Sequence, residues 1–135
     1  MILSLAQLRD LAASVGFPDP DLMAAIAMAE SGGDTDIVAD TRGLTDDQLR
    51  ARAGLPSTTP VSPEYSIGIW QINVLCKQAD GTYAICRDPA ALTDPAANAR
   101  AAYDLSSGGT NLGPWYTTMK LGRYQRWYTP PPVPR

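Results

Sequence analysis

The chain has 135 residues, of which 44% are hydrophobic and 19% charged, and its formal net charge is −3. These values predict one globular domain that buries about two-thirds of its unfolded surface, and the negative charge argues against nucleic acid as a partner. The chain contains no histidine, which excludes Ser-His and Cys-His catalysis and zinc sites with histidine ligands. Any chemistry must therefore come from carboxylates, tyrosines, backbone amides or the two cysteines.

The first predicted helix covers residues 4–15. Ser4 is a favourable N-cap, and Gln7, three residues later, completes a capping box. Leucines recur along one face of this segment, and Gly16 supplies the left-handed residue that commonly ends a helix.

A second helix is predicted to begin after Asp19, with Pro20 at its first position, and to end near Glu30. Residues 22–29 contain no polar side chain, and a helix that is apolar all round is a buried helix. Glu30 would then leave the core at the helix C-terminus, where partial burial and the negative end of the helix dipole both raise a carboxyl pKa. A carboxylic acid that stays protonated near neutral pH can act as a general acid. The alternative is a solvated glutamate at a helix end.

The sequence of the middle of the chain predicts little regular structure. Residues 34–44 and 56–63 are expected to be loops, and a capping box predicts a short exposed helix over 45–54 between them. Residues 65–74 have the apolar content of a strand.

The C-terminal part predicts a third main helix over residues 94–105, a break at 106–109 and a last short helix over 114–121. The domain is expected to span residues 1–127, and residues 128–135 are expected to be a proline-rich tail or linker. The predicted fold class is mainly α (α+β), with a small β element in the middle.

Four segments in chain order resemble the lysozyme-like superfamily, specifically its branch of soluble lytic transglycosylases and goose-type lysozymes. The resemblance covers about residues 19–127. The segments are Glu30-Ser31-Gly32-Gly33, the stretch Gly68-Ile69-Trp70-Gln71-Ile72 within residues 65–73, Asp94-Pro95-x-x-Asn98-Ala99-x-x-Ala102, and Gly113-Pro114-Trp115-Tyr116-Thr117 followed by Gly122-Arg123-Tyr124.

The resemblance implies a lysozyme-like fold, in which a helical domain and a small β-hairpin element surround a cleft. It implies cleavage of the β-1,4 bond between N-acetylmuramic acid and N-acetylglucosamine in peptidoglycan, with Glu30 as general acid and base and with no metal or other cofactor. The expected partner is the glycan strand of the bacterial cell wall, reached as a secreted or bacteriophage-associated protein. The alternatives are a hydrolytic muramidase or chitinase on the same fold, and a catalytically silent glycan-binding or structural module of a phage tail or secretion apparatus.

No apolar run reaches transmembrane length and no signal peptide is recognisable, so neither a membrane span nor a conventional export signal is expected. The chain is expected to act as a monomer or as one domain of a larger protein.

The candidates for substrate binding are Ser31, Ser66, Gln71 and Tyr124. Gln71 is either a satisfied core amide or a cleft group that holds a substrate acetamido or hydroxyl group. By resemblance, Tyr124 corresponds to the family tyrosine that lies near the acid, where it would hydrogen-bond Glu30 or the substrate; packing with Trp127 is its alternative.

A second catalytic carboxylate is not evident from the motifs, because Ser66 occupies the place where chicken-type lysozymes carry an aspartate. Lytic transglycosylases need one glutamate only, since the substrate's acetamido group and C6 hydroxyl supply the other roles. The resemblance therefore favours this reaction over hydrolysis. If a second acid positions water instead, the candidates are the loop residues Asp34, Asp36, Asp40 and Glu64, where solvated carboxylates are the default.

Cys76 and Cys86 flank a predicted hairpin at Asp80-Gly81. A three-residue loop over residues 80–82 would place the two cysteines directly opposite each other, close enough for a disulfide. An extracytoplasmic site of action, as the resemblance implies, favours the disulfide over two free thiols.

Overall fold

A computed structural model of the protein describes residues 1–130. Within this range five α-helices are present: α1 (Leu5–Val15), α2 (Pro20–Ser31), α3 (Asp46–Ala53), α4 (Pro95–Leu105) and α5 (Tyr116–Lys120). Three short 3₁₀-helices accompany them: η1 (Ala91–Thr93), η2 (Gly113–Trp115) and η3 (Arg123–Arg126). The five strands are β1 (Val38–Asp40), β2 (Tyr65–Ile67), β3 (Ile72–Asn73), β4 (Leu75–Lys77) and β5 (Tyr83–Ile85). The predicted α+β class is confirmed.

The predicted starts of the first two helices are confirmed by their caps. Ser4 and Gln7 form the capping box of α1, and the Asp19 carboxylate accepts a hydrogen bond from the backbone N–H of Leu22 at the start of α2. The α2 helix ends at Ser31, one residue beyond the predicted end, so Glu30 lies in its last turn.

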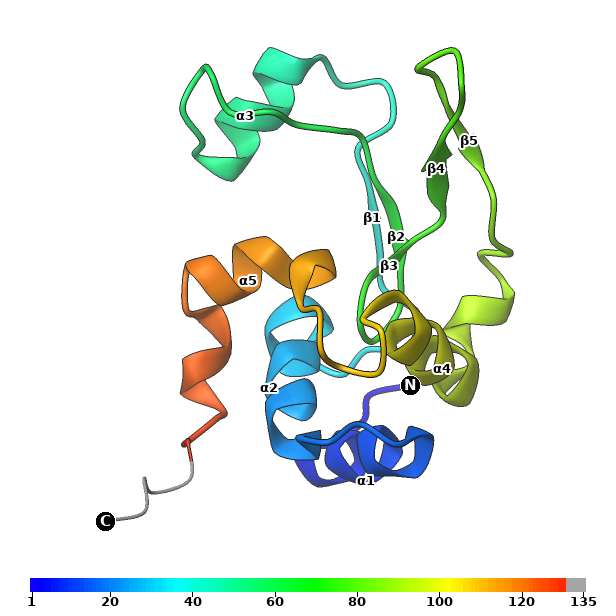
Figure 1. The fold of residues 1–135 in the computed structure, drawn as a ribbon, viewed down its shortest axis with the longest axis vertical. Coiled ribbons are helices and arrows are strands. Elements are labelled where there is room, and N and C mark those ends of the chain that lie inside the picture. The colour runs from blue at the N-terminus through cyan, green and yellow to red at the C-terminus, as the bar shows by residue number, and fades with distance from the viewer. Residues whose placement is uncertain (131–135) are drawn as a thin grey trace.

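The core is built around α2. Residues 23–27 of this helix are at most 2% exposed, as its apolar sequence predicts. The α1 helix packs against α2 and α4, whereas α5 and η3 pack against α2. Figure 1 shows the strands β1–β3 leaving this helical part, with α3 at their far end.

The middle of the chain differs from the prediction. The segment 34–44 contains strand β1, and the segment 65–74 is two strands joined by a turn, so that β1, β2 and β3 form an antiparallel sheet. The sequence did not reveal β1 because Val38 and Asp40 are both exposed, and an edge strand without a buried face lacks the alternation that marks a strand.

Asn98 of α4 connects the helical part to this sheet. Its side chain is fully buried; the amide nitrogen donates to the Ile67 and Leu92 carbonyls, at 2.8 and 2.9 Å, and the amide oxygen accepts from the Trp70 N–H at 3.0 Å. Gly68 passes so close that a Cβ there would lie 2.7 Å from the Asn98 amide nitrogen. The Asn98 and Gly68 positions of the family motifs are thus explained by packing.

Strands β4 and β5 form a separate hairpin, and a disulfide joins Cys76 to Cys86 with their Cα atoms 5.8 Å apart. The predicted register is wrong, because Cys76 pairs with Ala84 and the cysteines lie diagonally across the strands. A three-residue hairpin loop favours a left-handed residue at its last position. Gly81, with φ +86°, takes that position, so the loop covers residues 79–81 rather than 80–82.

The predicted break after α4 is confirmed, and the last predicted helix corresponds to η2 and α5. Tyr128, assigned to the tail by the sequence, donates a hydrogen bond to the Asp19 carboxylate at 2.7 Å, so contacts with the domain reach one residue beyond the predicted boundary. The rest of the predicted tail, from residue 131, lies outside the described residues. Across residues 1–130, none of the helices has the length and hydrophobicity needed to cross a membrane.

Candidate active site

A cleft of about 840 Å³ lies between the helical part and the sheet. Glu30 of α2 and Thr118 of α5 line one wall, which we call the helical wall. Glu64, which precedes β2, and Arg52 of α3 line the facing wall, which we call the sheet wall. In Figure 1 α5 and α2 lie below α3, and β1 and β2 lie to the right of these helices.

Glu30 is partly buried at the end of the apolar helix, as predicted. The Thr118 hydroxyl, on a residue only 3% exposed, donates a hydrogen bond of 2.9 Å to Glu30 Oε1. Burial raises the pKa of Glu30 above its ordinary value and the nearby Glu64 charge raises it further, whereas the Thr118 hydrogen bond and the Arg123 charge oppose the shift. The net shift of the Glu30 pKa is upward.

Thr118 is held in place by two buried tryptophans. Trp115, which precedes α5, donates its indole N–H to the Trp70 carbonyl at 2.8 Å, and Trp70 donates its own indole N–H to the Met23 carbonyl in α2 at 2.9 Å. These bonds fix α5 against α2, so Thr118 meets Glu30 in a preset geometry.

Glu64 is the one acid among the four predicted second carboxylates that lines the cleft. The Ser66 hydroxyl donates to Glu64 Oε2 at 3.2 Å. Burial raises the pKa of Glu64, whereas the Ser66 hydrogen bond and the Arg52 charge lower it.

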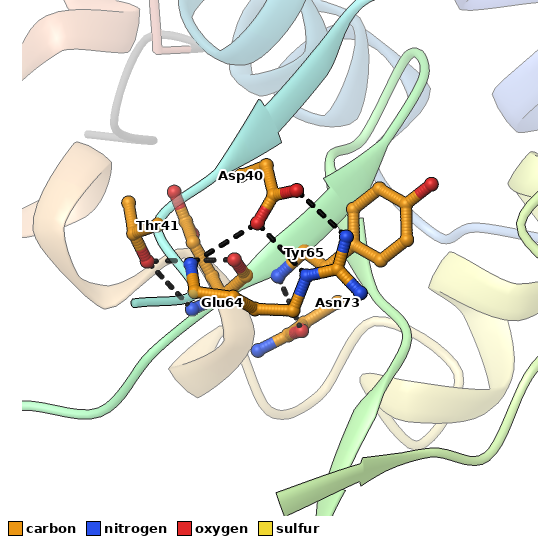
Figure 2. Close-up of polar contacts among 6 residues, drawn as sticks. Asp40, Thr41, Glu64, Tyr65 and Asn73 are labelled. Carbon is orange, nitrogen blue, oxygen red and sulfur yellow. Dashed lines mark hydrogen bonds and ion pairs between the residues drawn. The ribbon is translucent and has the colours of Figure 1, made fainter. Parts of the chain in front are cut away.

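The backbone of Glu64 is anchored to the neighbouring strands, as Figure 2 shows. Its N–H donates to the Thr41 hydroxyl at 2.8 Å and its carbonyl accepts from the Thr41 N–H at 2.9 Å. The next N–H, that of Tyr65, donates to the Asn73 side chain at 3.1 Å. Glu64 is therefore fixed to the sheet, although the sequence placed it in a loop.

The other three predicted acids do not line the cleft. Asp34 accepts a hydrogen bond from the Asp36 N–H, and Asp36 forms an ion pair with the amino group of Met1. Asp40 binds Arg42 through both carboxylate oxygens, at 2.9 and 2.7 Å, and these bonds lower its pKa to about 2. In this structure the side chains of Asp34, Asp36 and Asp40 are thus engaged elsewhere on the surface.

Gln71 lines the cleft. Its backbone is left-handed, with φ +49°, and its side-chain amide donates to the Gly68 and Ile37 carbonyls at 3.0 and 3.3 Å. Gln71 therefore lies in the cleft wall, and its amide nitrogen is already paired within the protein. The amide nitrogen bonds the turn, while the side-chain oxygen accepts no hydrogen bond from residues 1–130.

Ser31, Ser66 and Tyr124 do not line the cleft in the described part of the chain. The Ser31 hydroxyl donates to the Ala27 carbonyl and accepts from the Gly33 N–H, so it closes the end of α2 instead. Ser66 is buried behind Glu64. Tyr124 packs on the core and against Tyr128, and Thr118 takes the expected place of Tyr124 as hydrogen-bond donor to Glu30.

The sequence reasoning missed Thr118 and the anchoring of Glu64. For Glu64 a signal was available, because residues two apart in a strand share a face, and Glu64 stands two before the buried Ser66. For Thr118 we find no sequence signal, since one of two adjacent threonines in a short helix is not distinguished by pattern.

Within residues 1–130, no group of three or more histidine, cysteine, aspartate or glutamate side chains is arranged to hold a metal ion. The model for the family described as "Lysozyme like domain" matches residues 9–117. No curated protein and no solved structure matches the chain. A helical domain and a small sheet around a carboxylate-lined cleft define a lysozyme-like architecture. The chain belongs to the lysozyme-like domain family, whose members act on glycosidic bonds of peptidoglycan.

Proposed function

We propose that this domain cleaves the β-1,4 bond between N-acetylmuramic acid and N-acetylglucosamine in peptidoglycan, as a lytic transglycosylase with Glu30 as general acid and then base. The observation that carries the proposal is the partly buried Glu30 on the wall of an 840 Å³ cleft, hydrogen-bonded by a buried threonine. A binding module has no need for a carboxyl group with a raised pKa at that place.

The first step is proton transfer from Glu30 to the glycosidic oxygen, which releases the N-acetylglucosamine side of the strand with its new hydroxyl group. Thr118 occupies Oε1, so Oε2 is the oxygen available to carry the transferred proton. The substrate's acetamido oxygen bonds to the anomeric carbon as the glycosidic bond breaks, one of the substrate-assisted exceptions to two-carboxylate catalysis.

In the second step the Glu30 carboxylate accepts the proton of the muramic acid C6 hydroxyl. The C6 oxygen bonds to the anomeric carbon and displaces the acetamido oxygen, which gives a 1,6-anhydro ring and returns Glu30 to its protonated form. Gln71 supports this step by offering its side-chain oxygen to a substrate N–H or hydroxyl group from the cleft wall.

A second candidate is hydrolysis on the same fold, and the position of Glu64 favours it. Glu64 lines the same cleft as Glu30 and its charge acts on the Glu30 pKa. A carboxylate in this position can activate a water molecule, as in inverting glycosidases.

Digestion of peptidoglycan in ¹⁸O-water, followed by mass spectrometry of the products, tests both candidates. Transglycosylation gives 1,6-anhydro-muramic acid ends without label, whereas hydrolysis gives labelled reducing ends. Loss of the labelled product in Glu64→Gln would assign the water to Glu64. Intact glycan strands from a folded protein that still binds peptidoglycan would reject the enzyme and favour the silent binding module.

A further inference from the structure

Three cationic side chains line the cleft, each from a different element. They are Arg52 of α3, Lys77 of β4 and Arg123 of η3, and we call them the cleft cations. Arg52 acts on the pKa of Glu64 and Arg123 on that of Glu30, which places one arginine near each carboxylate. Within residues 1–130 none of the three forms an ion pair, a hydrogen bond or a stacking contact with an aromatic ring.

The cationic side chains outside the cleft differ from these three, because nearly all of them form an ion pair, a hydrogen bond or a contact with an aromatic ring. Arg9, Arg42 and Arg50 form ion pairs, Arg87 donates to the Asn73 carbonyl, and Lys120 and Arg126 lie over aromatic rings. The exposed Arg100 is the exception among residues 1–130. Cations left unpartnered around a substrate-sized space point to a ligand that brings its own negative charge.

The charge distribution supports the same conclusion. Of the ten cationic side chains in residues 1–130 the cleft holds three, but of the fourteen acidic ones it holds only Glu30 and Glu64. Outside the cleft, residues 1–130 therefore carry more acidic than cationic side chains, and Glu30 is neutral whenever it carries its proton. This balance of charges favours an anionic ligand in the cleft more than on the rest of the described surface.

We infer that the cleft cations select glycan strands that carry carboxylate groups over neutral polymers of N-acetylglucosamine. This inference rests on the proposed function, because it specifies the substrate of the same cleft. Two sources of carboxylate are present in peptidoglycan: the stem peptides, and the lactyl group of muramic acid once the stem has been removed. The cleft cations recognise the chemistry that both share.

The test measures binding without turnover, by calorimetry on Glu30→Gln at low and high salt. The probes are soluble glycan strands with stem peptides, the same strands after amidase treatment, and oligomers of N-acetylglucosamine. Arg52→Gln, Lys77→Gln and Arg123→Gln are compared singly and together, and Arg100→Gln serves as the matched control, an exposed cation outside the cleft.

Exposed ion pairs are weak, so each single change should weaken binding of stem-bearing strands about two- to fivefold, and the triple change by on the order of tenfold or more. Binding of neutral oligomers should not change, Arg100→Gln should behave like its parent, and added salt should reduce the preference for charged strands. A preference that survives amidase treatment assigns the lactyl carboxylate, and one that is lost assigns the stem peptide.

Equal binding of charged and neutral strands by the parent, or a preference that the triple change leaves intact, would overturn the inference while leaving the proposed function standing. If wild-type protein cleaves no glycan and the Glu30→Gln protein binds none, the proposed function and the inference fail together.

Discussion

The two walls of the cleft hold their carboxylates in different ways. On the helical wall Glu30 ends a helix whose residues 23–27 are at most 2% exposed, so close packing on several sides sets its position. On the sheet wall β1 is largely exposed and Leu49 is the one buried residue of α3, so Glu64 is set mainly by hydrogen bonds to Thr41 and Ser66. Close packing on several sides fixes an element more firmly than a few part-buried hydrogen bonds do. The proposed acid thus lies on the more rigid wall, and the wall that carries α3 has more freedom to adjust to a glycan.

The largest effect should come from removing the acid on the helical wall. Glu30→Gln should lower glycan cleavage by about 10²–10⁴-fold or more, because general acid catalysis is worth that much and the same group acts twice. Cleavage assays matched with thermal unfolding would measure this. More than a tenth of wild-type activity in a folded variant would mean that another residue is the acid.

The same variant tests the burial of Glu30. Because burial raises the pKa of Glu30, the wild-type protein should lose stability as the pH rises above the ordinary pKa of a glutamate and through the raised pKa. Glu30→Gln has no proton to lose at this position, so its stability should not show this loss. The difference in unfolding temperature, variant minus wild type, should therefore increase from acidic to neutral pH. A constant difference would contradict the raised pKa.

The connection between the two walls should be broken by Asn98→Leu. This change leaves the buried Ile67 and Leu92 carbonyls and the Trp70 N–H without their partner, and each unsatisfied buried group costs about 1–3 kcal/mol. Chemical denaturation should show a loss of about 3 kcal/mol or more. Asn111→Leu is the matched control, because the Asn111 side chain is exposed and accepts only from the Gly113 N–H; equal losses in the two variants would refute this role of Asn98.

The smallest effect should be a shift in pH dependence when Thr118 is changed to valine. The hydrogen bond from Thr118 favours the ionised Glu30 and so lowers its pKa. Without it the pKa rises, and the alkaline limb of the kcat/KM profile, where the acid loses its proton, should move to higher pH. Thr118→Ser keeps the hydroxyl and should restore the wild-type profile.

Glu64→Gln is the counterpart from the sheet wall and should act with the opposite sign. The Glu64 charge raises the pKa of Glu30, so its removal should move the alkaline limb to lower pH. Shifts of the same sign in Thr118→Val and Glu64→Gln would show that the limb does not report Glu30.

The helical wall was largely predictable from the sequence. Its helices have strong local signals, namely the caps at Ser4 and Asp19 and the uninterrupted apolar run of residues 22–29, and these act over a few residues. The sheet wall was not predictable to the same degree. The β1 strand exists because Val38–Asp40 pairs with a segment about 27 residues later, and its own residues carry no pattern that predicts this partner.

By itself the sequence determined the family, the helical framework and the place of Glu30, because local apolar periodicity, helix caps and motif order are properties of the chain. Only the tertiary structure decided which polar groups meet Glu30. It brings Thr118 to Glu30 across 88 positions of the chain, turns Glu64 rather than Asp34, Asp36 or Asp40 into the cleft, and leaves Tyr124 outside it. The physical reason is that a hydrogen bond of 2.9 Å depends on how helices pack against each other, and no short-range pattern encodes that distance.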